Sequence, residues 1–468
     1  MTLNEIVSAL SGIVWGPVMI TMLVGTGIYL TIRLKFVQIF QLGHAFKCIS
    51  GKYDVPEEEG DISHFRALTA ALSATIGTGN IAGVATAIAL GGPGAVFWMW
   101  ITAIVGMATK FTSCSLALHF RDIHEDGSAS GGPMYYLQKG FAPSWLVAIA
   151  GDERTKRWGI ALAMSFALFA MIASFGIGNM VQANSVVDGL KYVLPDNWAE
   201  PGFNLQLFGS TMFVSWLSLV IGLILAVLVG MVILGGIKRI ASVASKLVPG
   251  MSVLYVLGCL VILAMNISAI PAAFIMIVKY AFTPYAAGGG VAGAVVAQAL
   301  RYGVARGVFS NESGLGSAPM AHAAAKTKEM VREGMVAMLG PFIDTLIICT
   351  MTALVILVTG ARDSGLTSSS LTAHAFDLGL PGVGHHIVGI GLMLFAYSTT
   401  ISWSYYGDRC AEYLFGTRAI GWYRSVYVVF IVIGAIGGLK LIWNIADVLN
   451  AMMALPNLIG LLALGGFV

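Results

Sequence analysis

Two glycine-rich stretches place polar residues where a membrane helix tolerates them least. The first stretch runs through Gly77–Asn80, inside an apolar segment that covers residues 71–94. Glycine costs about 1 kcal/mol relative to alanine in a helix, and each unpaired backbone group in hydrocarbon costs several more. An unwound segment here would free N–H groups that suit a carboxylate and carbonyl groups that suit a hard cation. The alternative is an unbroken helix in which Gly79 and Gly83 form a packing face.

A second stretch has the same character. It covers Gly303–Lys326 and holds the polar run Ser310–Ser313 between Gly307, Gly314 and Gly316. Two glycine-interrupted spans in corresponding positions of two halves are typical of the binding site of a secondary transporter. The pair therefore favours unwinding over simple helix packing, and it predicts that both breaks meet near the middle of the membrane.

The composition predicts a polytopic membrane protein. Of the 468 residues, 57% are hydrophobic and 10% are charged, whereas soluble domains carry about 25% charged residues. The formal charge of +3 is too small to indicate a nucleic-acid partner. Spans of about 20 apolar residues are predicted at 12–33, 66–90, 95–119, 158–187, 211–234, 247–268, 291–310, 333–360, 385–406, 421–438 and 443–465.

Basic residues cluster in alternate loops, which predicts the orientation. Because such clusters stay in the cytoplasm, the N-terminus is expected outside and the C-terminus inside. The two broken spans are the second and the seventh, so spans 2–6 and 7–11 form two five-helix halves of opposite orientation. We therefore expect an extra helix and connector at 1–60, a first repeat at 61–270 and a second at 271–468. The short apolar run 270–284 is predicted to be an external interfacial or re-entrant helix.

The first break suggests two binding sites. Thr78, Gly79 and Asn80 begin the outer half of the span, so their amides and the Thr78 hydroxyl are assigned to a substrate carboxylate. The carbonyl groups on the other side of the break suit Na⁺, and they belong to Ser73, Ala74 and Ile76.

Polar residues in two other spans are further candidates. In span 9, Thr399 and Thr400 belong to a cluster of hydroxyl groups. These groups either bond to the preceding helical turn or supply oxygen ligands to Na⁺. The density of hydroxyl groups modestly favours the role as Na⁺ ligands. In span 4, Gln182 is a candidate substrate contact and Phe175 a candidate lid.

Two carboxylates lie within the predicted spans. Asp344 is either functional, as intramembrane ionisable residues usually are, or the structural partner of a basic residue, and the second interpretation is slightly favoured. The possible partners are Lys110, Arg301 and Arg306. Glu312 is expected to stabilise the second break by accepting amide hydrogen bonds.

The stretches "GTGNIAGVATAIALGGPGAVFWMW" and "RGVFSNESGLGSAPMAHAAAKTKE" closely resemble signatures of the alanine or glycine:cation symporter family. The resemblance covers essentially the whole chain, including "GGPMYYLQKG". It implies the amino acid–polyamine–cation superfamily fold, with five-plus-five inverted repeats like those of the bacterial leucine transporter. It also implies that Thr78 and Gly79 contact the substrate carboxylate and that Phe309, Ser310 and Asn311 line the side-chain pocket. The cation site that it implies matches Ser73, Ile76, Thr399 and Thr400.

We therefore expect a symporter of the cytoplasmic membrane that imports alanine or glycine with Na⁺ by alternating access. Na⁺ is the co-transported ion, and no obligatory protein partner is evident. Proton coupling stays open as an alternative. A channel would need a continuous polar pore and an enzyme would need converging ionisable side chains, and the sequence favours neither.

Overall fold

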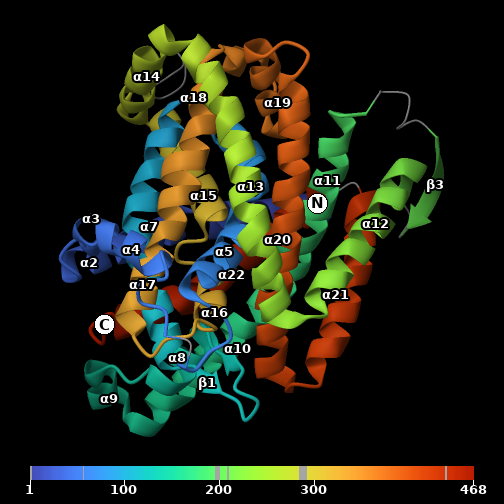
Figure 1. Cartoon of the computed structure of the whole chain (residues 1–468). Coiled ribbons are helices and arrows are strands. Elements are labelled where there is room, and N and C mark those ends of the chain that lie inside the picture. Colours follow the sequence, from blue (N-terminus) through green and yellow to red (C-terminus); the bar gives the residue numbers. More distant parts are fainter. Residues whose placement is uncertain (1–2, 56, 195–200, 208–209, 284–291, 438–439) are drawn as a thin grey trace.

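The computed structural model describes residues 3–55, 57–194, 201–207, 210–283, 292–437 and 440–468, which form a bundle of helices with two small hairpins (Figure 1). Within these residues, nine helices are long and apolar enough to cross a bilayer, and a bent pair brings the number to ten. The predicted polytopic helical fold is therefore confirmed. The remaining predicted span, 291–310, corresponds to α15 (Ala292–Asn311), which carries Arg301 and Arg306 and is not among the ten.

The elements of the first part of the chain alternate long helices with short connecting ones. They are α1 (Leu3–Val14), α2 (Pro17–Arg33), α3 (Val37–Phe40), α4 (Leu42–Ile49), α5 (His64–Thr75), α6 (Val84–Gly91), α7 (Gly94–His119), β1 (Asp122–Ile123), β2 (Ala129–Ser130), α8 (Pro133–Gly140), α9 (Ser144–Ala150), α10 (Asp152–Phe175), α11 (Val181–Lys191), β3 (Gly202–Leu207), β4 (Ser210–Ser215), α12 (Trp216–Ile233) and α13 (Gly236–Met265). The π-helical segments Gly79–Gly83 and Gly176–Met180 lead into α6 and α11.

The second part repeats this pattern. Its elements are α14 (Ile270–Phe282), α15, α16 (Ala318–His322), α17 (Met330–Pro341), α18 (Thr350–Val358), α19 (Ser368–Gly379), α20 (Gly384–Phe415), α21 (Ala419–Ile436) and α22 (Lys440–Leu464). A π-helical segment, Phe342–Cys349, joins α17 to α18. The predicted run 270–284 is the short helix α14, and most predicted span boundaries agree with the structure to within a few residues.

Two predicted spans begin differently. The predicted span 211–234 starts as strand, because residues 210–215 pair with β3 in an antiparallel hairpin. Thr211, Phe213 and Val214 are residue types that favour strands, and the helix begins only at Trp216, where the Ser215 hydroxyl accepts a hydrogen bond from Leu217 N (3.2 Å). The predicted span 247–268 begins eleven residues earlier, at Gly236, and contains Pro249.

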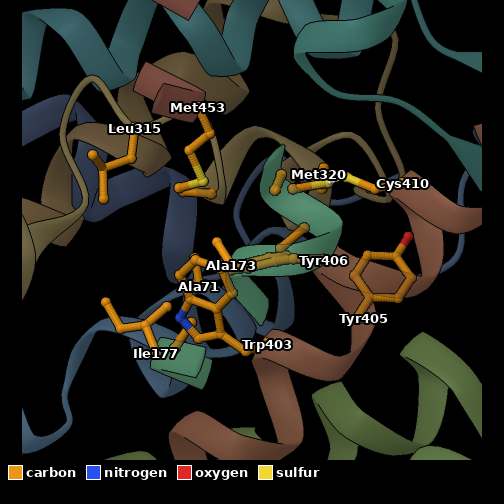
Figure 2. Close-up of a cluster of buried hydrophobic side chains, with 14 of the residues drawn as sticks. Ala71, Ala173, Ile177, Leu315, Met320, Trp403, Tyr405, Tyr406, Cys410 and Met453 are labelled. Atoms are coloured by element: carbon orange, nitrogen blue, oxygen red, sulfur yellow. Dashed lines mark hydrogen bonds between the residues drawn. The ribbon is translucent and has the colours of Figure 1, made fainter. Parts of the chain in front are cut away.

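The helices α7 and α20 lie at the centre of the bundle. They are the most buried spans, with 83% and 72% of the membrane window inside the protein. The helices α15 and α17 pack on α7, and α10, α11 and α13 pack on α20. Figure 2 shows part of the core around α20, where Trp403 and Tyr406 share one cluster with Ala71 of α5 and Ala173 of α10.

The two ends of the bundle differ. Figure 1 shows α14 and α19 at one end and α8, α9 and β1 at the other. At the β1 end the segments that precede α5 and follow α16 lie side by side, because Ile62 forms a parallel bridge with Ala325. The Arg121 guanidinium donates to Ala323 O (2.8 Å) and Ala325 O (2.6 Å). Burial lowers the pKa of Arg121, but a guanidinium stays charged in proteins, so it ties this end of the bundle together.

Candidate functional site

The first predicted break is confirmed. Helix α5 ends at Thr75, Ile76 is extended (φ −73°, ψ 90°), and the helix resumes at Gly79 after a bend of 52°. The freed amide of Gly77 donates to Asn80 Oδ1 (2.9 Å). The Asn80 side chain therefore stabilises the break, because its amide oxygen replaces the missing backbone partner of the Gly77 amide.

The second break begins after Asn311, and therefore later in the chain than Gly307. Helix α15 runs to Asn311, and the backbone then turns through Glu312 (φ +56°), Gly314 (φ +88°) and Gly316 (φ +90°) before α16. Left-handed conformations favour glycine, so Gly314 and Gly316 permit this turn. Gly307 has another role inside α15: a Cβ there would lie 2.6 Å from Thr102 Oγ1, so glycine allows α7 to approach.

The two breaks touch each other. A Cβ on Gly79 would lie only 2.9 Å from Ser310 Cα, so glycine is needed for this approach. Asp344 then connects them, because its Oδ1 accepts from Asn80 Nδ2 (2.7 Å) and its Oδ2 from Ser310 Oγ (2.8 Å). Residues that are far apart in the sequence are thus held in one buried polar cluster.

The partners of the two intramembrane carboxylates differ from the predicted ones. Among the ion pairs of the described residues, none involves Asp344, and Arg306 pairs with Asp447 (3.3 Å). The side chain of Glu312 accepts from Trp403 Nε1 (2.8 Å) and Ser317 Oγ (2.6 Å), which are side-chain donors rather than backbone amides. Both carboxylates are therefore satisfied by neutral groups.

Thr78 and Gln182, both candidate substrate residues, lie together. Gln182 Nε2 donates to Thr78 Oγ1 (3.3 Å) and to Ile177 O (2.9 Å). The Gln182 Oε1 atom is buried without a hydrogen-bond partner among the described residues, and it lies 3.6 Å from where a Cβ on Gly77 would be. An open acceptor thus faces the first break, next to the Thr78 hydroxyl and the N-terminal turn that starts at Gly79.

The other candidate substrate residues are more dispersed. Asn311 Nδ2 donates to Thr345 Oγ1 (3.1 Å), and Asn311 Oδ1 accepts from Ser313 N (2.9 Å). Both the donor and the acceptor of this side-chain amide thus have partners within the protein. The described ring contacts of Phe175 are with α21, namely with Tyr423, Tyr427 and Phe430.

Phe309 lies at a cavity beside the breaks. Its ring is stacked on Trp443 of α22, with the ring centroids 5.9 Å apart. Both rings line a cavity of about 240 Å³ that extends along the outer half of the first broken helix, past Gly83 and Thr86. A space of this kind next to the first break is consistent with a path between the α19 end and the site.

The candidate cation residues gather where α5 ends against α20. Ser398 Oγ donates to Ser73 O (3.2 Å), and Ser73 Oγ donates to Ser398 O (2.8 Å). The Thr399 hydroxyl would lie 2.5 Å from a Cβ on Gly77, so it faces the break directly. The hydroxyls of Thr399 and Thr400 also bond to carbonyl groups of their own helix (3.0 and 2.9 Å), as the alternative interpretation of this cluster expected.

The structure adds residues to this site that the sequence analysis did not select. Ser398 directly precedes Thr399 and Thr400 in the sequence, but only the fold shows that it bonds to Ser73. Trp403 lies near the end of a predicted span, where tryptophan is typical of the membrane interface, but it is buried and donates to Glu312. Trp403 follows Thr399 by four residues, which places both on one helix face. This spacing is the sequence signal that links Trp403 to the site.

The chain is similar to known proteins over its whole length. A family model described as "Sodium:alanine symporter family" matches residues 1–468. The sodium/alanine symporter AgcS of Methanococcus maripaludis is 48% identical over 472 residues, covering 100% of this chain and 96% of the relative. The probable sodium/glutamine symporter GlnT of Bacillus subtilis is 34% identical, covering 99% and 88%. Among solved structures, the crystal structure of MhsT in complex with L-phenylalanine covers 85% of this chain and 89% of its own, with a TM-score of 0.53 and 13% identity, which is a likeness of fold.

Proposed function

The chain belongs to the sodium:alanine symporter family, and on that premise we propose that its two helix breaks hold a small neutral amino acid beside one cation site. The protein is a sodium-coupled amino-acid symporter rather than an enzyme. One observation carries the proposal of the site: Gly79 at the first break and Ser310, in the last turn of α15 before the second break, are in close contact deep in the bundle. Unwound backbone at membrane depth is tolerated where it lines a cavity or binds a ligand.

The amino-acid site combines three kinds of group. The N-terminal turn at Gly79 and Asn80 offers amides to the substrate carboxylate, and the Thr78 hydroxyl is positioned beside them. The open Gln182 Oε1 suits the substrate ammonium group, because a buried acceptor without a partner is costly. Phe309 bounds the side-chain pocket together with Ser310, and we expect this ring to favour alanine or glycine over larger substrates.

The remaining substrate candidates act more indirectly in this proposal. Asn311 shapes the second break through its bonds to Thr345 and Ser313. Phe175 acts through its packing on α21, which supports the start of α11 where Gln182 lies. One relative is named for alanine and another for glutamine, so substrate size is the property to be measured.

The cation site is proposed at the end of α5. The carbonyl oxygens of Ser73 and Ile76 lie 3.2 and 3.5 Å from the Ser398 hydroxyl of α20, and Ala74 is assigned to the same site. Oxygen atoms are the ligands that hard cations prefer. Thr399 is the central hydroxyl ligand and Thr400 is assigned to the same site. Ser398 already bonds to Ser73, so it aligns α20 with α5. The residues fit Na⁺ because buried oxygen atoms of α5 and α20 lie next to each other.

The halves 61–270 and 271–468 are proposed to rock against each other around this shared site, with 1–60 as an added N-terminal unit. The alternation of basic loops supports an external N-terminus and a cytoplasmic β1 end of the bundle in the plasma membrane. At that end a cavity of about 900 Å³, lined by Asp61, Tyr405 and Arg409 among others, offers a release route.

Uptake into proteoliposomes tests the function. Purified protein should accumulate radiolabelled alanine when an inward Na⁺ gradient is the sole driving force, and glycine should compete. A K⁺ gradient should drive none. Accumulation driven by a pH gradient without Na⁺ would overturn sodium coupling in favour of proton coupling, and uptake that never saturates would indicate a channel.

A further inference from the structure

A groove on the outside of the bundle lies between the first turns of α10 and the last turns of α22. It holds about 540 Å³, all of its lining residues are hydrophobic, and they include Trp158, Ala161 and Leu162 of α10 and Ile459 and Leu462 of α22. Trp158 is 48% exposed and Leu462 is 44% exposed, so the groove opens to the surroundings of the bundle. Both helices are long and apolar enough to cross a bilayer, so those surroundings are lipid.

Two arginines precede the groove on the same face of α10. Arg154 lies four residues before Trp158, and Arg157 lies four residues before Ala161, so both belong to the helix face that lines the groove. Both are exposed, and neither has an ion-pair partner among the residues that the structure describes. Helix side chains lean toward the N-terminus, so the two guanidinium groups extend to the polar side of the membrane boundary.

The acidic residues of this first turn leave the arginine charges largely uncompensated. Asp152 is paired with Lys156, with the two charged atoms 2.6 Å apart. Glu153 is exposed and forms no ion pair among the described residues. The turn therefore keeps an excess of positive charge beside the groove.

This combination matches the chemistry of an anionic phospholipid. A hydrophobic groove that opens to the bilayer accepts an acyl chain, and unpaired arginines at its polar end suit a phosphate, which guanidinium groups bind in a bidentate manner. Basic sites between membrane helices on the cytoplasmic side are typical sites for anionic headgroups. Trp158, between the arginines and the rest of the groove, is a residue type that favours the headgroup level.

The groove also adjoins the second break through α22. Asn457 Nδ2 donates to Gly314 O (2.8 Å) at that break, and Ile459 of the groove follows two residues later. On its other side α22 packs on α8, because a Cβ on Gly460 would lie 2.5 Å from Leu137 Cδ2. A chain that fills the groove therefore supports the part of α22 that reaches the second break.

We propose that an anionic phospholipid binds in this groove, with its phosphate on Arg154 and Arg157 and an acyl chain between α10 and α22. The lipid is a structural ligand, separate from the amino acid and from Na⁺. It holds α22 in the position from which Asn457 reaches Gly314. Lipid binding goes beyond the proposed function, whereas the effect of the lipid on uptake rests on it.

Mass spectrometry of the intact protein released from detergent micelles measures the binding. Phosphatidylglycerol and phosphatidylcholine with the same acyl chains are compared. We expect the anionic lipid to bind about 30-fold more tightly, since each basic residue near an anionic headgroup contributes about fivefold. Equal binding of the two lipids overturns the inference, and so does a dimer without lipid, which would mean that a second copy covers the groove. Inorganic phosphate should not displace the lipid, and displacement would assign the arginines to a free anion instead.

Removal of the two charges is the second arm. The double variant Arg154→Gln with Arg157→Gln should bind both lipids equally well. The matched control is Lys246→Gln with Arg418→Gln, which removes two exposed basic residues on α13 and just before α21 and should keep the preference for phosphatidylglycerol. An equal loss of preference in the control would assign the effect to overall charge and overturn the site.

A groove-filling variant tests the hydrophobic half of the site. Ala161→Trp adds a large ring inside the groove and leaves both arginines in place, so we expect it to lose the bound phosphatidylglycerol. Ala161 is exposed, so the fold tolerates the larger side chain. Ile160→Trp changes the next residue, which points away from the groove, and should keep the lipid. Retention of the lipid by Ala161→Trp would place the lipid elsewhere.

Uptake in bilayers of defined composition measures the consequence for transport. Phosphatidylglycerol added to phosphatidylcholine should raise the initial rate of sodium-driven alanine uptake severalfold in the unmodified protein, and leave the double arginine variant unchanged. Equal rates in both bilayers would show that the lipid does not support α22, which overturns that part of the inference. Absence of sodium-driven uptake in every bilayer would overturn the proposed function instead, while mass spectrometry still decides whether the lipid binds.

Discussion

Asn80 and Asp344 are joined by a hydrogen bond of 2.7 Å, although 264 residues separate them in the chain. Asn80 is the residue that caps the first break, and Asp344 also accepts from Ser310 at the second break. The geometry of the first break is thus tied to that of the second through one buried carboxylate. Any movement that separates the breaks must disrupt these bonds or carry Asp344 along.

Replacing Asn80 by alanine should uncouple the breaks. The substitution leaves the Gly77 amide and a buried carboxylate oxygen without a partner, which costs about 1–3 kcal/mol per group. We expect a lower melting temperature in detergent and weaker alanine binding in calorimetry. Asn266→Ala, at the end of α13 and bonded only within its helix in the described residues, is the control. Equal effects of the two substitutions would show that the link from Asn80 to Asp344 carries no special role.

Gly79→Ala should weaken substrate binding by forcing the breaks apart. The added Cβ meets the backbone of Ser310 at 2.9 Å, so one of the two segments must shift. Overpacking of this kind costs about 1–3 kcal/mol, and if that cost falls on the bound state, the affinity falls about five- to 150-fold. The control is Gly25→Ala in α2, where nothing lies within 4 Å of the new Cβ. Alanine binding is measured by calorimetry, and an unchanged dissociation constant for Gly79→Ala would contradict the contact.

Thr78→Ala should reduce alanine affinity because it removes a hydroxyl that we assign to the substrate carboxylate. A hydrogen bond to a charged group is worth about 1.5–3 kcal/mol, so a loss of about ten- to hundredfold is expected. Thr78→Ser keeps the hydroxyl and should retain most of the affinity. If the serine variant loses as much as the alanine variant, the methyl group matters through packing and the carboxylate assignment is wrong.

The sequence allowed the helices and the breaks to be predicted, because both follow from local properties. Long apolar runs determine spans such as α7, and the glycines at 77, 79, 314 and 316 mark the places where helices cannot continue cheaply. The hairpin at β3 was missed because residues 211–215 are as apolar as a span. Side-chain partners could not be predicted, since Asn80 and Asp344, or Trp403 and Glu312, meet only when distant helices pack.

Thr399 and Thr400 should differ in their effect on sodium. Both hydroxyls bond to their own helix, so replacing either by valine should leave the fold intact. The Thr399 hydroxyl faces Gly77 at the end of α5. At Thr400 the backbone carbonyl accepts a hydrogen bond from the Tyr427 hydroxyl. We therefore expect Thr399→Val to raise the half-saturating Na⁺ concentration for uptake more than Thr400→Val does, and the double variant to abolish sodium-driven uptake. The reverse order would move the cation site along α20.

Glu333 should hold the inner halves of both broken helices together. Its carboxylate is fully buried and is shared by His64, the first residue of α5, and His322, the last residue of α16, whose Nδ1 lies 2.6 Å from Oε1. Glu333→Ala leaves His322 without its carboxylate partner and leaves His64 only with Asp54, whose Oδ1 lies 4.0 Å from Nε2, and this loss costs on the order of 3 kcal/mol.

We expect this variant to expose the inner end of the site more often, so a cysteine introduced at Ala74 should react faster with a thiol reagent added from the cytoplasmic side. Glu57→Ala, an exposed glutamate of the loop before α5, controls for charge. If the thermal stability falls but the cysteine reactivity does not change, the two inner halves move as one body even without the carboxylate. The backbone bridge between Ile62 and Ala325 would then suffice to join them.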